Sequence, residues 1–210
     1  MRTLITIWTL SVILLQACNK KPDKEYLFNE NFDSNEIGWP EEFTSSHTTE
    51  IRNGAYFIDS KTQDSNKLQT SVSPQKISLY NLPKHYEITT AIRRIKANEK
   101  SKCGIVLVSP SLIYNLSISA SGNVEVVEYD YNTELETTLF KGNYNSSAKI
   151  SSNEVNLRIE VNGLYLKLYI DDKSIGDSIK CKSKNWEDIR LFTSTQAAIS
   201  IDYLRIKKLN

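Results

Sequence analysis

The sequence predicts an all-β protein in which two antiparallel sheets pack face to face. Short runs rich in Tyr, Ile, Val, Thr and Phe recur between Tyr26 and Asn210, separated by Gly, Asn, Asp and Ser. Beyond the first 17 residues, no stretch keeps a helical apolar period for three turns. About a dozen short strands with close turns therefore favour one β-sandwich domain.

Residues 1–17 form a processing segment that we expect to be a helical signal peptide. Arg2 supplies a positive start, and an apolar stretch runs from Leu4 to Leu15. A membrane-crossing helix needs about 20 apolar residues, so this stretch is too short for one. Leu15-Gln16-Ala17-Cys18 resembles the bacterial lipobox. That resemblance implies cleavage before Cys18 and a diacylglycerol on its thiol.

The lipobox resemblance also predicts where the protein resides. Lipidated Cys18 would anchor the mature chain in the bacterial cell envelope, with residues 18–25 as a short polar tether and 26–210 as the domain. Asn19 follows the cysteine, where an aspartate marks inner-membrane retention in some bacteria. This favours the outer membrane, on its periplasmic or surface face.

Charge argues against one class of partner. Residues 1–17 contain one charged residue, Arg2, so 25 basic and 25 acidic residues remain after cleavage. A neutral domain lacks the basic excess that drives binding to a phosphate backbone. We therefore expect no nucleic-acid partner.

Three hairpins carry the fold prediction, taken in chain order. Asn53-Gly54 suits a tight turn because both residues tolerate positive φ, and it would pair Ile51 with Tyr56 and Thr49 with Ile58. A three-residue loop at 121–123 would pair Ala120 with Val124 and Ile118 with Val126. Asn162-Gly163 would pair Val161 with Leu164, Ile159 with Leu166 and Leu157 with Leu168. Each hairpin then has one apolar face.

The remaining runs predict further strands, and the export signal raises the question of a disulfide. We expect strands at residues 26–32, 67–72, 86–96, 103–109, 135–141, 188–194 and 198–208. Cys103 and Cys181 can form a disulfide in an oxidising compartment, which would close a long loop worth about 4–5 kcal/mol. Two separate buried thiols are the alternative.

Several motifs together resemble the concanavalin A-like lectin/glucanase superfamily, and most of all its laminin-G-like jelly-roll domains, including those grouped with 3-keto-disaccharide hydrolases. They occur in the expected order over nearly all of 26–210: Asn31-Phe32-Asp33 with Gly38-Trp39, Asn53-Gly54-Ala55-Tyr56, Cys103 to Leu107, Tyr114 to Val124, Asn156 to Asp171, and Ile201 to Ile206. The resemblance implies a two-sheet jelly roll. It does not fix an activity, because this fold carries hydrolases, lectins and adhesion modules alike.

The search for catalytic groups gives no firm site. Laminarinase-type members carry Glu-x-Asp-x-(x)-Glu on one strand, and the nearest stretch here is Glu128 to Glu134. Glu128 and Asp130 would share a face, but Asn132 takes the place of the third carboxylate, and Glu134 comes later. The alternative is a solvated strand edge. The two histidines form no zinc motif, so we expect no catalytic metal.

Two further groups are candidates for binding. Asp171 and Asp172 lie in a predicted turn and can contribute to a Ca²⁺ site, as in some relatives, or simply bond to the local backbone. Tyr165, Tyr169 and Arg158 lie on the polar face of the 157–168 hairpin, where flat rings beside polar groups can stack on sugars. The alternative is that these tyrosines cover a sheet face.

The prediction that follows is a non-catalytic, lipid-anchored jelly roll that binds a glycan or another envelope component. A glycoside hydrolase that uses Glu128, Asp130 and Glu134 is the first alternative. A structural or protein-interaction module is the second. No cofactor is expected other than the Ca²⁺ considered above.

Overall fold

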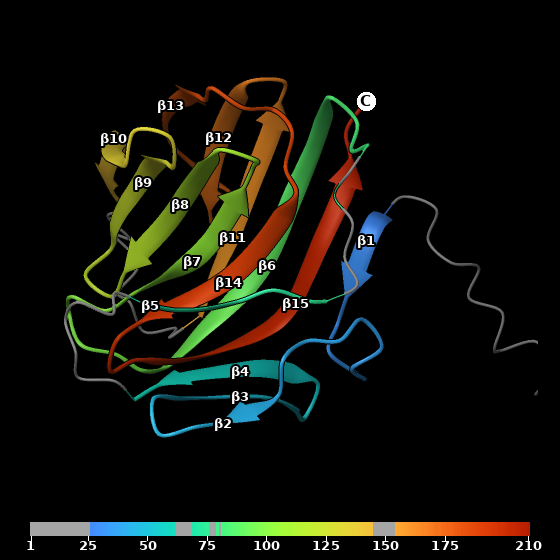
Figure 1. Ribbon diagram of the computed structural model, residues 1–210, viewed down its shortest axis with the longest axis vertical. Helices are drawn as coiled ribbons and strands as arrows, with labels where there is room; N and C mark the ends of the chain where they lie inside the picture. The colour runs from blue at the N-terminus through green and yellow to red at the C-terminus, as the bar shows by residue number, and fades with distance from the viewer. Residues whose placement is uncertain (1–25, 62–68, 76–78, 80, 145–153) are drawn as a thin grey trace, which may run out of the picture.

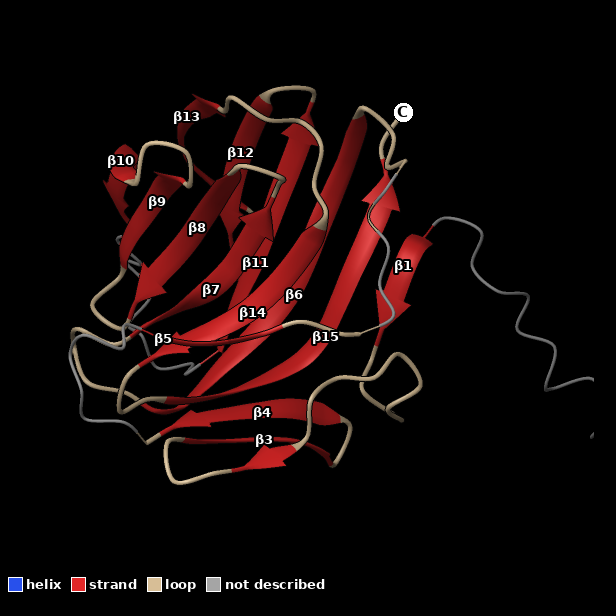
Figure 2. Cartoon of the chain, viewed as in Figure 1, coloured by secondary structure: helices blue, strands red, loops and turns tan. Residues whose placement is uncertain are grey.

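The computed structural model describes residues 26–61, 69–75, 79, 81–144 and 154–210 (Figure 1). The predicted signal helix, the lipidation site Cys18 and the tether lie outside these residues. The described chain consists of strands, turns and loops (Figure 2). Within it, we find no helical segment with the length and hydropathy that a bilayer crossing requires.

Two antiparallel sheets form the sandwich, as the sequence predicts. In Figure 1, β14 and β5 of the smaller sheet cross in front of β6 and β15 of the larger one. The larger sheet, sheet A, contains in spatial order β13 (Lys173–Lys180), β12 (Tyr165–Ile170), β11 (Glu154–Asn162), β6 (His85–Lys96), β15 (Ala198–Lys208), β4 (Ala55–Ser60), β3 (His47–Arg52) and β2 (Glu42–Phe43). In addition, β1 (Tyr26–Glu30) pairs with β15.

The smaller sheet, sheet B, contains six strands among the described residues. Its spatial order is β10 (Leu135–Asn143), β9 (Asn123–Asp130), β8 (Leu112–Ser119), β7 (Lys102–Val108), β14 (Asp188–Ser194) and β5 (Gln69–Val72). The order mixes strands far apart in sequence, since β14 inserts between β7 and β5. Only the β7 to β10 part is a run of consecutive strands.

The hairpin at Asn53-Gly54 has the register that the sequence predicts. Ile51 lies opposite Tyr56 and Thr49 opposite Ile58. Asn53 and Gly54 both adopt positive φ, at 52° and 71°. These angles suit the two central positions of a type I′ turn, whose twist matches that of the strands.

The other two predicted hairpins have the correct faces but a register that is wrong by two residues. Val161 pairs with Leu166 rather than Leu164, because Gly163 with φ of 59° takes the first turn position and Leu164 the second. Ile118 pairs with Val124 rather than Val126, because the loop is residues 120–122 and ends on Gly122. A shift of two keeps every side chain on its face, so the predicted apolar faces are still buried.

Strand β13 was not among the predicted strands. Its eight residues contribute only Ile175 and Ile179 to the core, and Gly176 has a φ of 68°. The pairing with β12 shifts register between Leu166 and Leu168. An edge strand that buries two residues and contains an irregularity does not show the period-2 pattern that reveals a strand.

The core lies between the sheets, and its N-terminal part contains an aromatic cluster. Phe32, Trp39 and Tyr56 form an aromatic cluster with ring centroids 4.9–5.6 Å apart. The carboxylate of Glu30 accepts hydrogen bonds from the Phe32 backbone N–H at 2.7 Å and from Trp39 Nε1 at 3.4 Å. The opening Asn-Phe-Asp and Gly-Trp motifs are therefore structural.

Phe140 links the free edges of the two sheets. A Cβ added to Gly142 on β10 would lie 2.6 Å from the Phe140 ring, and one added to Gly176 on β13 would lie 2.4 Å from it. Two glycines thus make room for one ring that reaches from sheet B across to sheet A. The contact closes one side of the sandwich at a point where neither edge strand has another partner in its sheet.

The two remaining cysteines are buried free thiols. Cys103 lies opposite Ile118 on β8, whereas the residue after Cys181 donates its backbone N–H to the Tyr114 hydroxyl. Ile118 and Tyr114 are four residues apart on one strand, about 13 Å. The structure therefore contains the two separate buried thiols that the sequence analysis gave as the alternative to a disulfide.

Candidate functional site

The outer face of sheet B combines apolar, aromatic and hydrogen-bonding side chains. Its residues form rows across the strands, because residues paired in register on neighbouring strands lie side by side. The first row runs from β14 to β10 as Phe192, Gly104, Ser117, Glu125 and Lys141. The second consists of Arg190, Val106, Asn115, Val127 and Thr138. The third consists of Asp188, Val108, Ile113, Tyr129 and Glu136.

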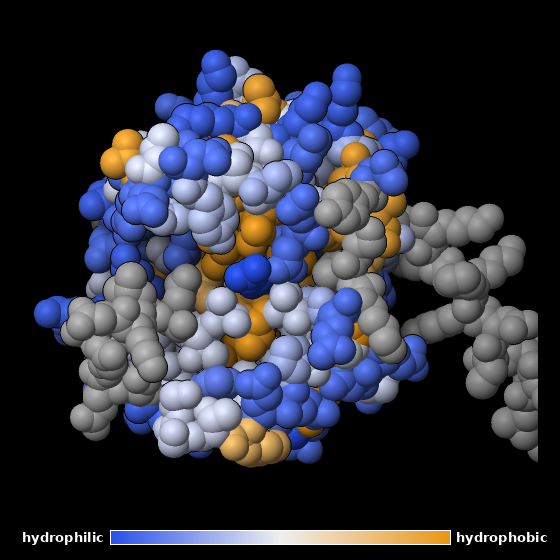
Figure 3. All heavy atoms as spheres, viewed as in Figure 1, coloured by the Kyte–Doolittle hydropathy of each residue, from blue (hydrophilic) through white to orange (hydrophobic). Residues whose placement is uncertain are grey.

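An apolar floor occupies the β14 and β7 side of this face. Val106, Val108 and Phe192 form a small hydrophobic cluster separate from the main core, with Ile113 packed against it. Figure 3 shows this face from the front, with an apolar floor in a recess bordered by polar residues. An apolar floor with a polar border is the usual construction of a ligand site.

Gly104 determines how deeply Phe192 can lie in the floor. The two residues are neighbours in the first row, and Phe192 is only 1% exposed. A Cβ on Gly104 would lie 3.2 Å from the Phe192 ring and 2.0 Å from the carbonyl oxygen of Leu116. The absence of a side chain at this position therefore lets the ring lie against the sheet.

Between the floor and β10 lies a hollow of about 350 Å³, which we call the first hollow. Its lining includes Phe192, Asn115, Ser117, Glu125, Tyr129 and Glu136. The volume falls within the range of small-molecule sites, at its lower end. Amide, hydroxyl and carboxylate groups thus surround a space that has aromatic rings on two sides.

Tyr129 is the aromatic side chain best placed to contact a ligand. It is partly exposed, and its ring stands at 90° to the ring of Tyr131, with centroids 5.4 Å apart. Tyr131 is half exposed in the turn after β9. Of the two rings, that of Tyr129 lines the first hollow, where it offers a flat apolar surface.

Glu125 is held between two lysines at the boundary of this hollow. Lys102 Nζ lies 2.6 Å from Glu125 Oε2, and Lys141 Nζ lies 3.1 Å from Glu125 Oε1. The hydrogen bond from Lys102, with help from Lys141, lowers the pKa of Glu125. The carboxylate therefore stays ionised at neutral pH and is suited to holding the lysines, not to donating a proton.

The predicted catalytic carboxylates do not face this hollow. Glu128 points to the inside of the sandwich, where Tyr114 donates a hydrogen bond to it at 2.7 Å and Lys182 Nζ at 2.5 Å. Asp130 has the same parity on β9, so the two share a side as predicted, and Asp130 accepts a hydrogen bond from the Asn132 backbone N–H. Glu134 lies in the exposed turn with a φ of 56°. Their catalytic role stays a prediction.

The predicted binding residues lie on the other side of the molecule, on the outer face of sheet A. Arg158 lies opposite Tyr169, with its Cζ 3.6 Å from the ring centroid. The Tyr169 hydroxyl donates to Glu160, which also pairs with His85 at 3.0 Å. One face of the Tyr169 ring is thus covered, whereas Tyr165 is half exposed at the hairpin end. Their role as ligand-binding residues stays a prediction.

Asp171 and Asp172 occupy a two-residue turn between β12 and β13. Both have positive φ, at 47° and 62°. Asp171 accepts hydrogen bonds from the Tyr144 hydroxyl and from the Asn156 backbone N–H, and the first of these raises the pKa of Tyr144 to about 12. Among the described residues, no group of three His, Cys, Asp or Glu side chains could hold a metal ion. Calcium at this turn stays a prediction.

The residues of the first hollow were not predicted, although part of the signal is local. The alternation that buries Val124 and Val126 also places Glu125, Val127 and Tyr129 on the opposite face of the same strand. The position of Phe192 follows only from the pairing of β14 with β7. Phe192 and its partner Gly104 are 88 positions apart in the sequence (192 − 104), and turn chemistry does not reveal such a pairing.

Comparisons with known proteins bear on the fold. No protein-family model matches the chain. No curated protein matches it either. Solved structures do match, among them the laminarinase catalytic domain from Thermotoga maritima, with a TM-score of 0.64 and 10% identity over 89% of this chain and 99% of that one.

Two other similar structures come from different proteins. The GlcNAcα1-4Gal releasing endo-β-galactosidase from Clostridium perfringens has a TM-score of 0.63 and 12% identity, over 87% of this chain and 62% of that one. The GH43 BlXynB protein from Bacillus licheniformis has a TM-score of 0.58 and 15% identity, over 90% of this chain. The present chain spans only 40% of the length of that GH43 protein. The fold is a concanavalin A-like jelly-roll sandwich, which confirms the fold that the sequence resemblance implied.

Proposed function

We propose that this chain is a lipid-anchored, non-catalytic glycan-binding protein whose ligand lies in the first hollow on the outer face of sheet B. The observation that carries the proposal is the combination in one recess of the Tyr129 ring and the amide, hydroxyl and carboxylate groups of Asn115, Ser117 and Glu136. Sugars have apolar ring faces and hydroxyl edges, so they need both kinds of partner.

The similar solved structures support a sugar ligand. By their names, the laminarinase and the endo-β-galactosidase act on glycans. Identities of 10% and 12% carry the fold but not the chemistry, since one fold hosts many functions. The support from the comparisons is therefore secondary to that from the composition of the hollow.

The spacing of acidic groups favours binding without cleavage. Glycoside hydrolases commonly hold two carboxyl groups about 5–9.5 Å apart. The two acidic residues of the first hollow are Glu125 and Glu136, and Glu136 lies opposite Tyr129, four residues along β9 from Glu125. Four residues span about 13 Å of strand between Cα atoms, so the two carboxyl groups would have to turn toward each other to act as a pair. In addition, Glu125 forms ion pairs with Lys102 and Lys141.

The lipid anchor is the second part of the proposal. Its basis is the Leu15 to Cys18 motif after a short apolar segment. Two or more acyl chains give stable anchoring, whereas one holds only reversibly. Labelling of the full chain by an alkyne fatty acid in cells, and loss of the label in Cys18→Ser, is the expected result. An unlabelled full chain would contradict the anchor but would not affect the proposed binding site.

The binding site is tested by Tyr129→Ala. Loss of the stacking surface is expected to weaken binding of the full chain to a soluble glycan such as laminarin by about 10-fold, because one aromatic contact is worth about 1 kcal/mol or more. Isothermal titration calorimetry measures the affinity, and circular dichroism verifies the fold of the variant.

Tyr165→Ala is the matched control, because Tyr165 is an exposed tyrosine on the other sheet. Its affinity should equal that of the wild type. If Tyr165→Ala or Tyr169→Ala loses binding while Tyr129→Ala keeps it, the ligand lies on sheet A, as the sequence alone suggested. If no glycan on an array binds the wild type, the proposed function is wrong.

A further inference from the structure

A second hollow of about 380 Å³ lies next to the first, on the same side of sheet B. The two share Lys102 and Glu125 as a common boundary. The second hollow extends toward the turn between β8 and β9, where Ser119, Ser121 and Asn123 line it. From Tyr129 to Asn123 the strand covers about 20 Å, so the two hollows together can hold more than one unit of a linear ligand.

The formal charge changes sign between the two hollows. The ionisable residues of the first are Lys102, Glu125 and Glu136, one cation against two anions. Those of the second are Lys100, Lys102 and Lys141 against Glu99 and Glu125, three cations against two anions. A ligand that fills both hollows therefore meets a negative end and a positive end.

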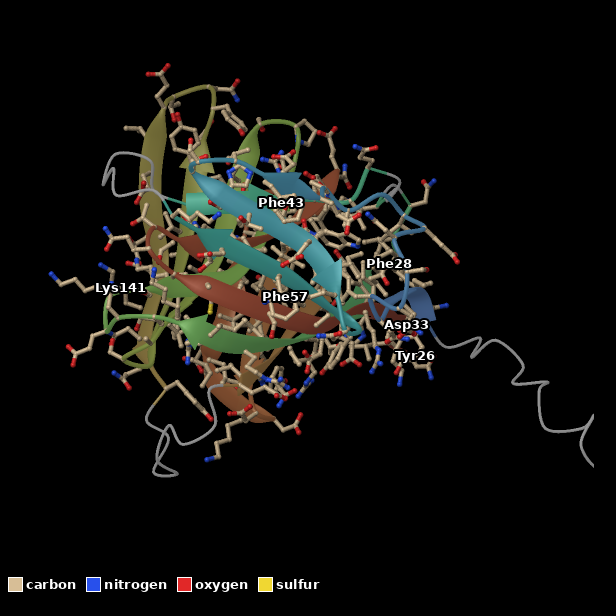
Figure 4. The ribbon with its side chains drawn as sticks, turned by 90° about the horizontal axis from the view of Figure 1, so that it is seen from below. Tyr26, Phe28, Asp33, Phe43, Phe57 and Lys141 are labelled. Atoms are coloured by element: carbon tan, nitrogen blue, oxygen red, sulfur yellow. The ribbon has the colours of Figure 1, made fainter. Side chains whose placement is uncertain are left out.

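The lysine pair keeps donors available for a ligand. Each ammonium group has three N–H donors, and the bond to Glu125 uses one from Lys102 and one from Lys141. One carboxylate between two ammonium groups leaves a net positive charge on the side of the second hollow, which both lysines line. Lys141 is 71% exposed and lies on the edge strand, across the molecule from Tyr26 and Phe28 (Figure 4).

A fourth cation, Arg94, contacts a residue that lines the second hollow. Arg94 on β6 donates a hydrogen bond from its guanidinium to the backbone carbonyl of Ser119 at 3.1 Å. Ser119 itself lines the hollow. Because Arg94 is partly buried, its charge is less screened than that of a surface lysine. It adds to the positive potential at this end of the groove.

We propose that the second hollow binds an anionic substituent, a carboxylate or a sulfate, on a glycan unit farther along the same ligand than the unit stacked on Tyr129. This inference rests on the proposed function, since it concerns the same groove. A charge-assisted hydrogen bond from Lys141, reinforced by Lys102, would select acidic glycans over neutral ones.

The test measures affinities of the full chain for three soluble polymers: polygalacturonate, which is rich in carboxylates, dextran sulfate, and neutral laminarin. Lys141→Met keeps the apolar stem and removes the charge. It should weaken binding to one or both acidic polymers by about 10-fold and leave laminarin binding within about 2-fold. A loss with one polymer alone tells carboxylate from sulfate, and a loss with both means that the second hollow accepts either group.

Lys180→Met on β13 is the matched control, because it removes an exposed lysine from the other sheet and should change no affinity. An equal loss in Lys180→Met would show that only the net charge matters and would overturn the inference. An unchanged affinity of Lys141→Met for both acidic polymers would do the same. If Tyr129→Ala still weakens laminarin binding in that case, glycan binding in the first hollow remains supported and only the anionic site in the second hollow is overturned.

Discussion

Replacing Gly104 by alanine is expected to lower the free energy of unfolding by about 3 kcal/mol. The added Cβ would lie 2.0 Å from the Leu116 carbonyl oxygen, which belongs to the backbone of the neighbouring strand and cannot rotate away. The same Cβ would press on the Phe192 ring. The strands must therefore separate locally, and the ring must move into the first hollow. Urea denaturation measures the first effect, and glycan affinity measures the second.

Gly163→Ala separates this clash from the general cost of replacing a glycine. Gly163 has a φ of 59°, and a Cβ there would meet nothing within 4 Å. Its substitution should cost about 1 kcal/mol, the penalty of a left-handed conformation alone, and leave ligand binding unchanged. Equal losses in the two variants would mean that the close approach of β7 to Leu116 and Phe192 does not contribute.

The sequence was sufficient for side-chain faces but not for every register. Alternation decides which residues are buried, and the structure buries Val161, Ile159 and Leu157 as predicted. The register depends on which two residues make the turn, and Asn-Gly can supply either both central positions or only the glycine. At Asn53-Gly54 it supplies both, and at Asn162-Gly163 only the glycine does. Nothing in either dipeptide distinguishes the two cases.

The candidate site was harder to predict because it depends on contacts between distant strands. Tyr165 and Tyr129 carry the same local signal, a tyrosine on the polar side of an apolar hairpin. The two tyrosines differ in the residues that the neighbouring strands of each sheet place beside them. The β14 strand brings Phe192 into the row of Glu125 and Asp188 into the row of Tyr129. On sheet A, by contrast, Arg158 and Glu160 already contact Tyr169. Residue periodicity carries no information about such long-range pairing.

Replacing Glu128 by alanine is expected to lower the free energy of unfolding by about 3 kcal/mol. Glu128 is 1% exposed and accepts hydrogen bonds from the Tyr114 hydroxyl and from Lys182. Its removal leaves a cavity and a buried hydroxyl without its acceptor. Tyr114 also packs edge-on against Trp186, with ring centroids 5.2 Å apart. A shift of Tyr114 would therefore also weaken the packing of Trp186, which precedes β14.

Glu128→Gln distinguishes this structural role from a catalytic one. Glutamine keeps the volume and an acceptor for Tyr114 and loses only the charge opposite Lys182, whose side chain is largely exposed. The expected loss is therefore about 1 kcal/mol, a third of that in Glu128→Ala. A catalytic carboxylate would behave differently, because both substitutions would abolish the release of reducing sugar while the stability of the glutamine variant changed little. Wild-type hydrolysis of laminarin that disappears in Glu128→Gln would support the hydrolase alternative. A graded loss of stability without hydrolysis in any variant is what the inward position of Glu128 leads us to expect.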